Sequence, residues 1–231
     1  MTIKWRPFRP LFRGTVIFDR LLACVGAAIG IGLTVLTCAR LPVAVSALPI
    51  IVAPIGASAV LVFAVPASPL AQPWPVVGGN IISTLVGVAC ARLIPDVAFA
   101  AGVSVGAAIL VMYLLRCLHP PGGAAALTAV IGGPTIHAAG YAFAFIPVGI
   151  NSIAIALLAM VFHRYSGHSY PHRPSIKPAD LEAAHVAAGI LTEDIDSALA
   201  DLPDSFDISR DDLDILLTKA ELHAIARRAR R

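Results

Sequence analysis

One stretch decides the fold: Arg116-Cys117-Leu118-His119-Pro120-Pro121-Gly122-Gly123-Ala124-Ala125-Ala126-Leu127. It lies deep in the most apolar part of the chain. Its paired prolines must interrupt a helix there, because each lacks a backbone N–H and clashes with the preceding turn. Pro120 also pushes His119 out of the α region, so we expect one helix to end near His119 and another to begin at Pro121. A broken backbone at membrane depth is tolerated only where it is buried in protein or lines a cavity, which makes this break a candidate functional site.

The composition indicates an integral membrane protein. Of 231 residues, 58% are hydrophobic and 13% are charged, whereas about 25% of a soluble globular chain is charged. The apolar part from Leu21 to Phe162 carries four charged side chains (Arg40, Arg92, Asp96 and Arg116), and twelve of the fourteen acidic residues lie at Asp180 or beyond. The predicted fold class is therefore all-α: a polytopic transmembrane helix bundle with a short helical soluble tail.

The charge distribution divides the chain into four parts. Residues 1–20 form a basic, aromatic segment suited to the membrane interface, for which nucleic-acid binding is not favoured. Residues 21–164 form the transmembrane domain, 165–176 a linker and 177–231 a charged helical tail. In the tail, helices are predicted over 177–202 and 209–231, with a capping box at Ser209. The second helix carries a predicted apolar stripe, Leu213, Leu216, Leu217, Ala220 and Ile225.

Six membrane segments are predicted, over residues 21–39, 45–65, 76–93, 97–118, 121–131 and 141–162. The fifth is shorter than the roughly 20 residues that a crossing requires. Most basic residues fall on one side if all six cross, which favours both termini in the cytoplasm of a multi-pass protein of the cell (inner) membrane. Four crossings with two re-entrant segments is the alternative.

An internal repeat is suggested by two pairs of matching stretches. Pro54-Ile55-Gly56-Ala57-Ser58 aligns with Pro120-Pro121-Gly122-Gly123-Ala124, and the stretch before Asn80 aligns with that before Asn151. Chance similarity in a Gly- and Ala-rich protein is the alternative. If the repeat is real, three segments per half give an inverted 3+3 repeat, the arrangement that marks a solute site in many transporters. Helix N-termini at the two breaks would then offer free N–H groups to a small anion.

These motifs resemble the signature of the HPP integral-membrane family, which is named after its His-Pro-Pro sequence. The resemblance rests on the stretch from Arg116 to Ala124, on Pro54 to Ala64 and on Ser68-Pro69-Leu70-Ala71-Gln72-Pro73-Trp74, and it covers about residues 21–164. It implies a multi-helix membrane protein, and some members are associated with nitrite transport. Longer relatives continue into CBS domains, which are not expected in a chain that ends at Arg231.

We therefore predict a transporter or channel for a small inorganic anion, with nitrite as the first candidate and no enzymatic activity. The expected partners are the lipid bilayer, the anion and a further copy of the chain, and nucleic acid is not among them. The candidate solute-binding residues are Pro54, Gly56, Ala57, Ser58, Asn80, His119, Pro120, Pro121, Gly122, Gly123 and Asn151.

Several of these residues have a second interpretation. His119 is either a proton-coupling or solute-contacting group or a helix-end side chain that caps carbonyl groups. Asn80 and Asn151 are either solute ligands or helix-packing residues. The four cysteines have no CxxC spacing, so no disulfide, metal site or cofactor is expected. An assembly protein without a conducted solute, and less favourably an intramembrane enzyme using Ser58 and His119, are the alternatives in function.

Overall fold

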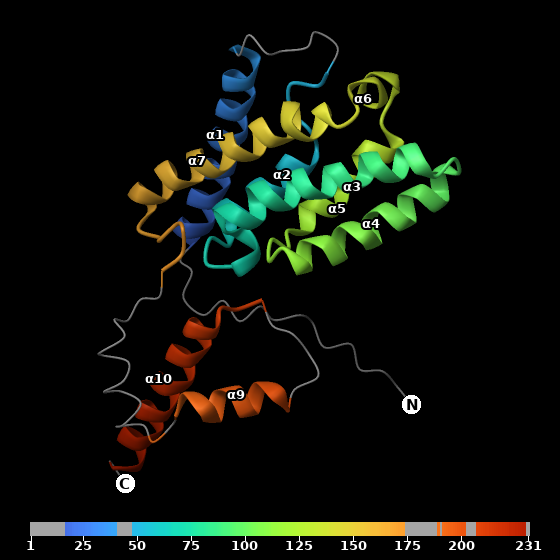
Figure 1. Cartoon of the computed structure of the whole chain (residues 1–231). Helices are drawn as coiled ribbons and strands as arrows, with labels where there is room; N and C mark the ends of the chain where they lie inside the picture. Colours follow the sequence, from blue (N-terminus) through green and yellow to red (C-terminus); the bar gives the residue numbers. More distant parts are fainter. Residues whose placement is uncertain (1–16, 41–47, 174–188, 190, 202–206, 230–231) are drawn as a thin grey trace, which may run out of the picture.

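The computed structural model describes residues 17–40, 48–173, 189, 191–201 and 207–229, and every regular element in these ranges is a helix. Figure 1 shows a helical bundle with two further helices below it. The bundle contains α1 (Ile17–Arg40), α2 (Pro54–Ala64), η1 (Pro69–Ala71), η2 (Pro75–Gly79), α3 (Asn80–Leu93), α4 (Val97–Leu114), α5 (Pro120–Ile131), α6 (Pro134–Ala139), η3 (Ala144–Gly149) and α7 (Ile150–Ser166); the tail contains α9 (Thr192–Ala200) and α10 (Arg210–Arg228). The prediction of an all-α membrane protein is confirmed.

The membrane helices are of two lengths. Four are long and apolar enough to cross a bilayer: α1, η2 with α3, α4, and η3 with α7, whose mean hydropathy lies between 1.6 and 2.3. The other two, α2 and α5, have 11 and 12 residues. At about 1.5 Å per residue each covers roughly half of a hydrocarbon core about 30 Å thick. The order long, short, long therefore occurs twice along the chain.

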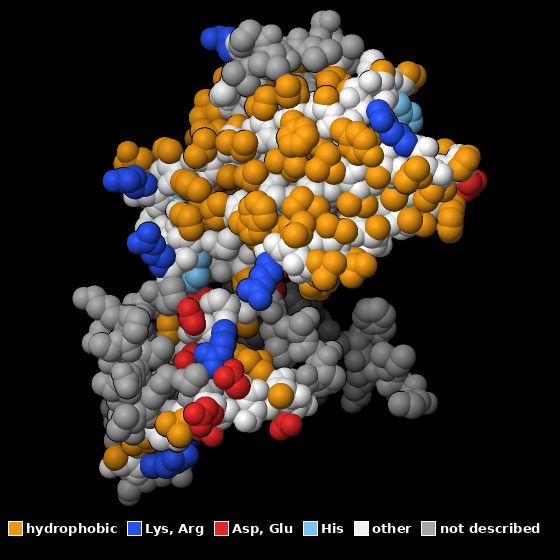
Figure 2. Space-filling view, viewed as in Figure 1, with side chains coloured by type: hydrophobic (Ala, Val, Ile, Leu, Met, Phe, Trp, Pro, Cys, Tyr) orange, Lys and Arg blue, Asp and Glu red, His pale blue; other side chains and the backbone are white. Residues whose placement is uncertain are grey.

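The bundle is apolar on its outside. Phe99, Leu110 and Leu157 are all more than half exposed, and Figure 2 shows hydrophobic side chains over the whole visible face of the bundle. A monomeric soluble protein rarely exposes such a large apolar surface, whereas a bilayer solvates it. This surface is the one that contacts lipid.

The two halves pack in equivalent ways. α1 packs against α2 and α7, and α4 packs correspondingly against α5 and α3. The short helix α2 lies on α7 as α5 lies on α3, and α2 and α5 meet each other. If α1 is taken as equivalent to α4, α2 to α5 and α7 to α3, the same pairs of helices pack together in both halves.

Each short helix belongs to a segment that runs along the bundle: α5 begins beside Gly79, where Gly122 contacts it, and near its end Ala129 lines a cavity with Arg92. Asn151 hydrogen-bonds to both Cys38 and Ile50, so the chain before α2 lies beside the C-terminal end of α1. After α2, Pro66 lies in a groove with Asp19 and Arg20 at the opposite end of α1. An irregular stretch followed by a half-length helix thus covers the length that α1 covers by itself.

The predicted helix boundaries differ from the structure in several places, and one helix was not predicted. The second segment becomes helical only at Pro54, because a proline suits the first helical turn and not the interior. α4 ends at Leu114, four residues before the predicted end, and Cys117 N caps it by donating to Met112 O with Arg116 at φ +54°. The sequence analysis did not predict α6, which lies between α5 and η3.

The tail contacts the loop that contains η1. Ser68 Oγ donates to the Asp207 carboxylate at 2.9 Å, and His172 Nε2 lies 2.8 Å from Asp212 Oδ2. Trp74 Nε1, from the same loop, donates to Leu115 O, so the turn after α4 lies at this end of the bundle too. Arg116, in that turn, therefore lies at the end of the bundle that the tail contacts.

The face of the last helix that is buried is not the predicted apolar stripe. Ser209 caps α10 as expected, its hydroxyl accepting from Asp212 N. However, Leu216 is 57% exposed, whereas Asp214, Ile215 and Thr218 are buried. The buried positions are thus shifted by about one residue along the helix from the predicted leucine positions. Packing against a neighbouring segment, and not the apolar spacing alone, determines which face of α10 is buried. Residues 177–188, in the first predicted tail helix, lie outside the described residues.

Candidate functional site

A cluster of four buried polar side chains lies where the short helices meet the two helices that begin with a π turn. Ser58 comes from α2, Asn80 from the start of α3, His119 from the residue before α5, and Ser152 from the start of α7. All four have no solvent exposure. We call these four residues the polar cluster; it joins segments from both halves of the bundle.

The hydrogen bonds of His119 define its tautomer. Its Nδ1 lies 2.8 Å from Leu70 O, and a carbonyl can only accept, so Nδ1 carries the proton and donates. In the neutral ring, Nε2 is then an acceptor, and Ser58 Oγ donates to it across 2.8 Å. The histidine therefore links α2 to the loop around η1, and it leaves neither ring nitrogen free.

Asn80 completes the chain of hydrogen bonds. Its Nδ2 lies 3.0 Å from Val76 O and 3.2 Å from the hydroxyl oxygens of both Ser58 and Ser152. The carbonyl of Val76 requires a donor, which orients the amide with its nitrogen on this side. Asn80 Oδ1, on the other side, is buried and has no hydrogen-bond partner among the residues that the structure describes. A buried polar atom without a partner is costly, and in a native protein it calls for an explanation.

Two glycines let the helices approach closely enough to enclose the cluster. A Cβ on Gly79 would lie 2.6 Å from His119 Cβ and 2.7 Å from Cys117 O. A Cβ on Gly122 would lie 2.6 Å from Ser83 Oγ and 2.9 Å from Gly79 O. These positions exclude any side chain, so their role in this structure is close packing of α5 on α3.

The helix N-termini offer few free donors. Pro120 and Pro121 have no N–H, and Gly122 N already donates to His119 O at 2.8 Å. At the start of α2, Ile55 N and Gly56 N donate to the carbonyls of Val52 and Ala53. The expectation that both breaks present free N–H groups was therefore wrong in this conformation, because local turns use these donors.

The remaining predicted residues lie around the cluster or away from it. Pro54 and Pro121 are buried, whereas Gly56, Ala57 and Pro120 are exposed and Gly123 is half-buried. Asn151 forms a second polar node, with Oδ1 accepting from Val52 N at 3.1 Å and Nδ2 donating to Ile50 O at 3.0 Å. Every polar atom of that amide has a partner.

Sequence analysis missed three residues of the site. Ser152 contacts Asn80, Leu70 supplies the carbonyl for His119, and Gly79 contacts the His119 side chain. Gly79 and Ser152 directly neighbour the two asparagines that the sequence did indicate. Nothing local marks Leu70, because a backbone carbonyl is present at every residue.

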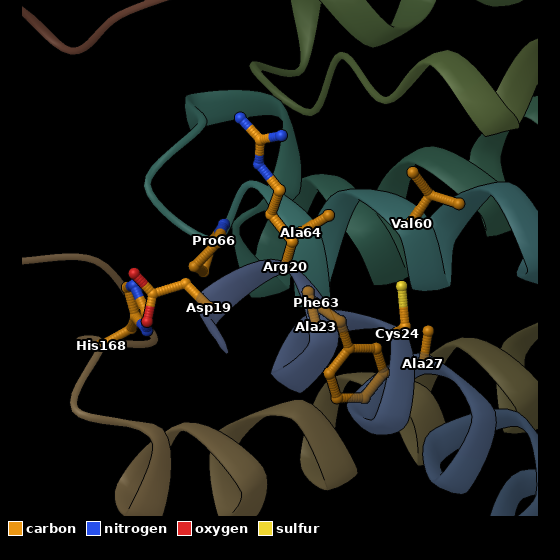
Figure 3. Close-up of a pocket in the computed structure, with 10 residues that line it drawn as sticks. All are labelled: Asp19, Arg20, Ala23, Cys24, Ala27, Val60, Phe63, Ala64, Pro66 and His168. Carbon is orange, nitrogen blue, oxygen red and sulfur yellow. The ribbon is translucent and has the colours of Figure 1, made fainter. Parts of the chain in front are cut away.

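Two cavities border the bundle, and neither is lined by the polar cluster. A groove of about 360 Å³ lies between α1 and α2, with Asp19, Arg20 and His168 at one end and Cys24, Val60 and Phe63 along it. Figure 3 shows the labelled residues that line this groove, with Asp19 and His168 drawn at one end and Arg20 directed away from them. A second cavity of about 170 Å³ contains Arg92 and His137 at the other end of the bundle. Within the described residues, no group of three or more His, Cys, Asp or Glu side chains could hold a metal ion.

The fold and the site define a class: a multi-pass helical membrane protein with an uncharged polar centre enclosed by short, proline-initiated helices. A family model described as the HPP transmembrane region matches residues 14–171. The chain belongs to this family, as its motifs predicted.

The curated relatives are also membrane proteins. One transmembrane protein of Dictyostelium discoideum is 35% identical over 127 residues, which cover 53% of this chain and 44% of the relative. Another from the same organism is 37% identical over 114 residues, covering 48% and 36%. The aligned regions span less than half of each relative's length. No solved structure matches.

Proposed function

We propose that this protein transports a small inorganic anion across the membrane, with nitrite as the first candidate. The observation that carries the proposal is the polar cluster of Ser58, Asn80, His119 and Ser152, fully buried and hydrogen-bonded together where both halves of the bundle meet. Polar and ionisable groups are expensive in a membrane and mark solute pathways when they are retained. The candidate pathway passes this cluster, between the breaks at Pro54–Gly56 and Pro120–Gly123. Nitrite is named as the first candidate because the chain resembles family members that are associated with nitrite transport.

The equivalent packing of the two halves supports transport. Each half contributes a long helix, a proline-initiated short helix and a long helix that begins with a π turn. We infer an inverted repeat, in which rocking of one half against the other would expose the cluster to each side in turn. A π turn, a feature that is frequent at functional sites, precedes Asn80, and a stretch kinked at the non-helical Ile146 precedes Asn151.

We also propose six crossings, with both termini in the cytoplasm. The segments that contain α2 and α5 connect opposite ends of the bundle, which favours crossings over re-entrant loops. Arg20, Arg116 and Arg164 lie at the end that the tail contacts, and basic residues concentrate on the cytoplasmic side. Cysteine labelling tests this: a cysteine at Pro95, in the exposed turn between α3 and α4, would react with an impermeant reagent from outside intact cells if six segments cross, and would be protected if only four do.

One observation favours a second function. Ser58 Oγ and His119 Nε2 have the 2.8 Å separation of a nucleophile and its base. The partner of His119 Nδ1 is a backbone carbonyl rather than a carboxylate, however, and both side chains are sealed from solvent. We therefore retain the proposal of a transporter without enzymatic activity.

A flux assay tests the proposed function. The purified full chain is reconstituted in liposomes, and uptake of nitrite, nitrate, formate and chloride is compared with that of protein-free vesicles. Uptake of at least one of these solutes above the protein-free level is expected. If none exceeds that level, the transport proposal is overturned, and an assembly role becomes the better interpretation.

A further inference from the structure

We propose that the polar cluster receives its solute as a neutral molecule that donates a hydrogen bond, namely the protonated form of a weak acid, and not as a bare anion. This inference rests on the proposed transport function and specifies the form of the solute. It starts from Asn80 Oδ1, which is fully buried, has no partner, and belongs to the residue that connects Ser58 with Ser152. A carbonyl oxygen can be satisfied only by a donor. An anion would bring another acceptor to it and repel it.

The donors of the cluster are already engaged. His119 Nδ1 donates to Leu70 O, and Ser58 donates to His119 Nε2. The hydroxyl of Ser152 donates to Val148 O at 2.8 Å, and that of Thr84 to Asn80 O at 2.7 Å. An arriving anion would therefore have to break existing hydrogen bonds before any donor could turn towards it. A hydroxyl-bearing solute adds a bond to the cluster without breaking one.

The electrostatics lead to the same conclusion. The described residues place no Lys or Arg among the buried side chains of the bundle; its cations lie exposed at helix ends. Moving a bare anion from water into such surroundings is very unfavourable, whereas a neutral acid of the same size loses little hydration. Free N–H groups at a helix N-terminus normally compensate an anion for its lost hydration. At the start of α5 the two prolines have no N–H, and that of Gly122 already donates to His119 O.

The proposal balances charge and protons. The anion takes up one proton at the entry side, the neutral acid crosses, and the acid dissociates into the same anion and one proton at the exit side. One proton therefore accompanies each anion, and no net charge moves. No oxidant, reductant or covalent intermediate takes part.

The pH dependence is assigned to the solute. The titratable side chains buried on or beside elements that pack against Asn80 are His119, before α5, His163, near the end of α7, and the thiols of Cys90 and Cys117. His119 contacts only Leu70 O and Ser58 Oγ through its ring nitrogens, and His163 Nε2 lies 2.8 Å from Val62 O, so neither imidazole is paired with a carboxylate among the described residues. The charged residues of these elements, such as Arg92, Arg116 and Arg164, are exposed. If a group of the protein set the pH dependence, every solute would share it.

Nitrite and nitrate provide the test, because they are similar in size and charge but only nitrite is the anion of a weak acid. Uptake into proteoliposomes of the full chain is measured from pH 7.5 to 5.5 and corrected for protein-free vesicles. At a fixed total concentration below saturation, we expect nitrite uptake to rise about tenfold for each unit of decreasing pH, following the neutral acid. Nitrate uptake should stay at background, and an interior dye should report acidification with each nitrite. Clamping the membrane potential with potassium and valinomycin should not change the rate.

Asn80→Leu removes the acceptor and nearly conserves the side-chain volume. It should lower nitrite uptake at least tenfold, whereas Ser104→Ala, which removes a buried hydroxyl bonded within α4, should not. Unchanged uptake by folded Asn80→Leu, or nitrate uptake equal to that of nitrite and independent of pH, would overturn this inference and leave transport standing. Absence of both nitrite and nitrate uptake would overturn this inference, and the transport proposal falls as well if formate and chloride are not taken up either. If Asn80→Leu does not fold, comparing nitrite uptake with nitrate uptake by the unmodified protein still tests this inference.

Discussion

Ser58 Oγ on α2 and His119 Nε2 before α5 lie 2.8 Å apart, although 61 positions separate the two residues in the chain. The bond joins the two short helices at the centre of the bundle. Through His119 Nδ1 it continues to Leu70 in the loop around η1. That loop in turn receives Tyr170 and the tail, because the Tyr170 hydroxyl donates to Ala71 O at 2.8 Å. The polar cluster and the tail thus contact opposite sides of one loop.

Ser58→Ala is expected to destabilise the bundle. The change leaves His119 Nε2 without its donor and removes one acceptor from Asn80. An unsatisfied buried polar group costs about 1–3 kcal/mol. Thermal unfolding in detergent should therefore show a midpoint several degrees lower than that of the unmodified protein. Ser104→Ala is the matched control, because its hydroxyl bonds only to a carbonyl of its own helix. Equal midpoints for the two variants would show that the Ser58–His119 bond contributes nothing to stability.

Gly87→Ala should disrupt the contact between α3 and α5. A Cβ at Gly87 would overlap the backbone of Ala126, whose carbonyl oxygen and Cα cannot move without shifting α5. We expect a loss of about 1–3 kcal/mol, as is typical of overpacking. Gly106→Ala, in α4, is the control, since nothing lies within 4 Å of its Cβ position. Unfolding midpoints of the two variants provide the comparison, and a Gly87→Ala protein as stable as the control would contradict the close approach.

Asn151→Leu should loosen the chain just before α2. The amide satisfies Val52 N and Ile50 O, and leucine can satisfy neither. Hydrogen exchange measured by mass spectrometry should become faster in a peptide covering residues 48–56. Ile153→Leu, a change on the half-exposed lipid-facing side of α7, should leave that exchange unchanged. Exchange as slow in Asn151→Leu as in the control would mean that other contacts hold this segment.

Tyr170 should make the protein sensitive to alkaline pH. Burial of its hydroxyl against Ala71 raises the pKa of the phenol above its ordinary value, which is about 10. A raised folded-state pKa means that the contribution to stability is complete below the unfolded pKa and is lost as pH rises towards the folded one. The unfolding midpoint should therefore fall above about pH 10, and it should fall less steeply in Tyr170→Phe. Parallel pH profiles for the two proteins would contradict a raised pKa of Tyr170 in the folded state.

Ser58 should not react with a fluorophosphonate probe. A serine activated for hydrolysis is accessible and has a base oriented by a third group. Here both side chains are fully buried, and a backbone carbonyl orients the histidine. Intact-mass measurement of the folded protein after incubation should show no adduct. Stoichiometric labelling at Ser58, absent from Ser58→Ala, would instead support the enzyme alternative.

The predicted site residues differ in how the structure uses them. Ser58, Asn80 and His119 come together because each lies at or near the start of a short helix or a π turn, and these starts converge. Gly122 could be identified as functionally important from the sequence, yet its immediate neighbours show a packing role. The sequence contains the helix breaks but not the carbonyls that their N–H groups find, so it predicted free donors where Ile55, Gly56 and Gly122 are already bonded.

The sequence alone determined the membrane location, the family and the approximate order of the helices, because hydropathy, charge asymmetry and proline positions act locally along the chain. The double proline at 120–121 was enough to predict a break. Only the tertiary structure decided what the break does. It placed His119 between Ser58 and Leu70, and it left Asn80 Oδ1 without a partner. Hydrogen bonds between residues far apart in the chain depend on how the helices pack, and no local pattern encodes whether a buried acceptor finds its donor.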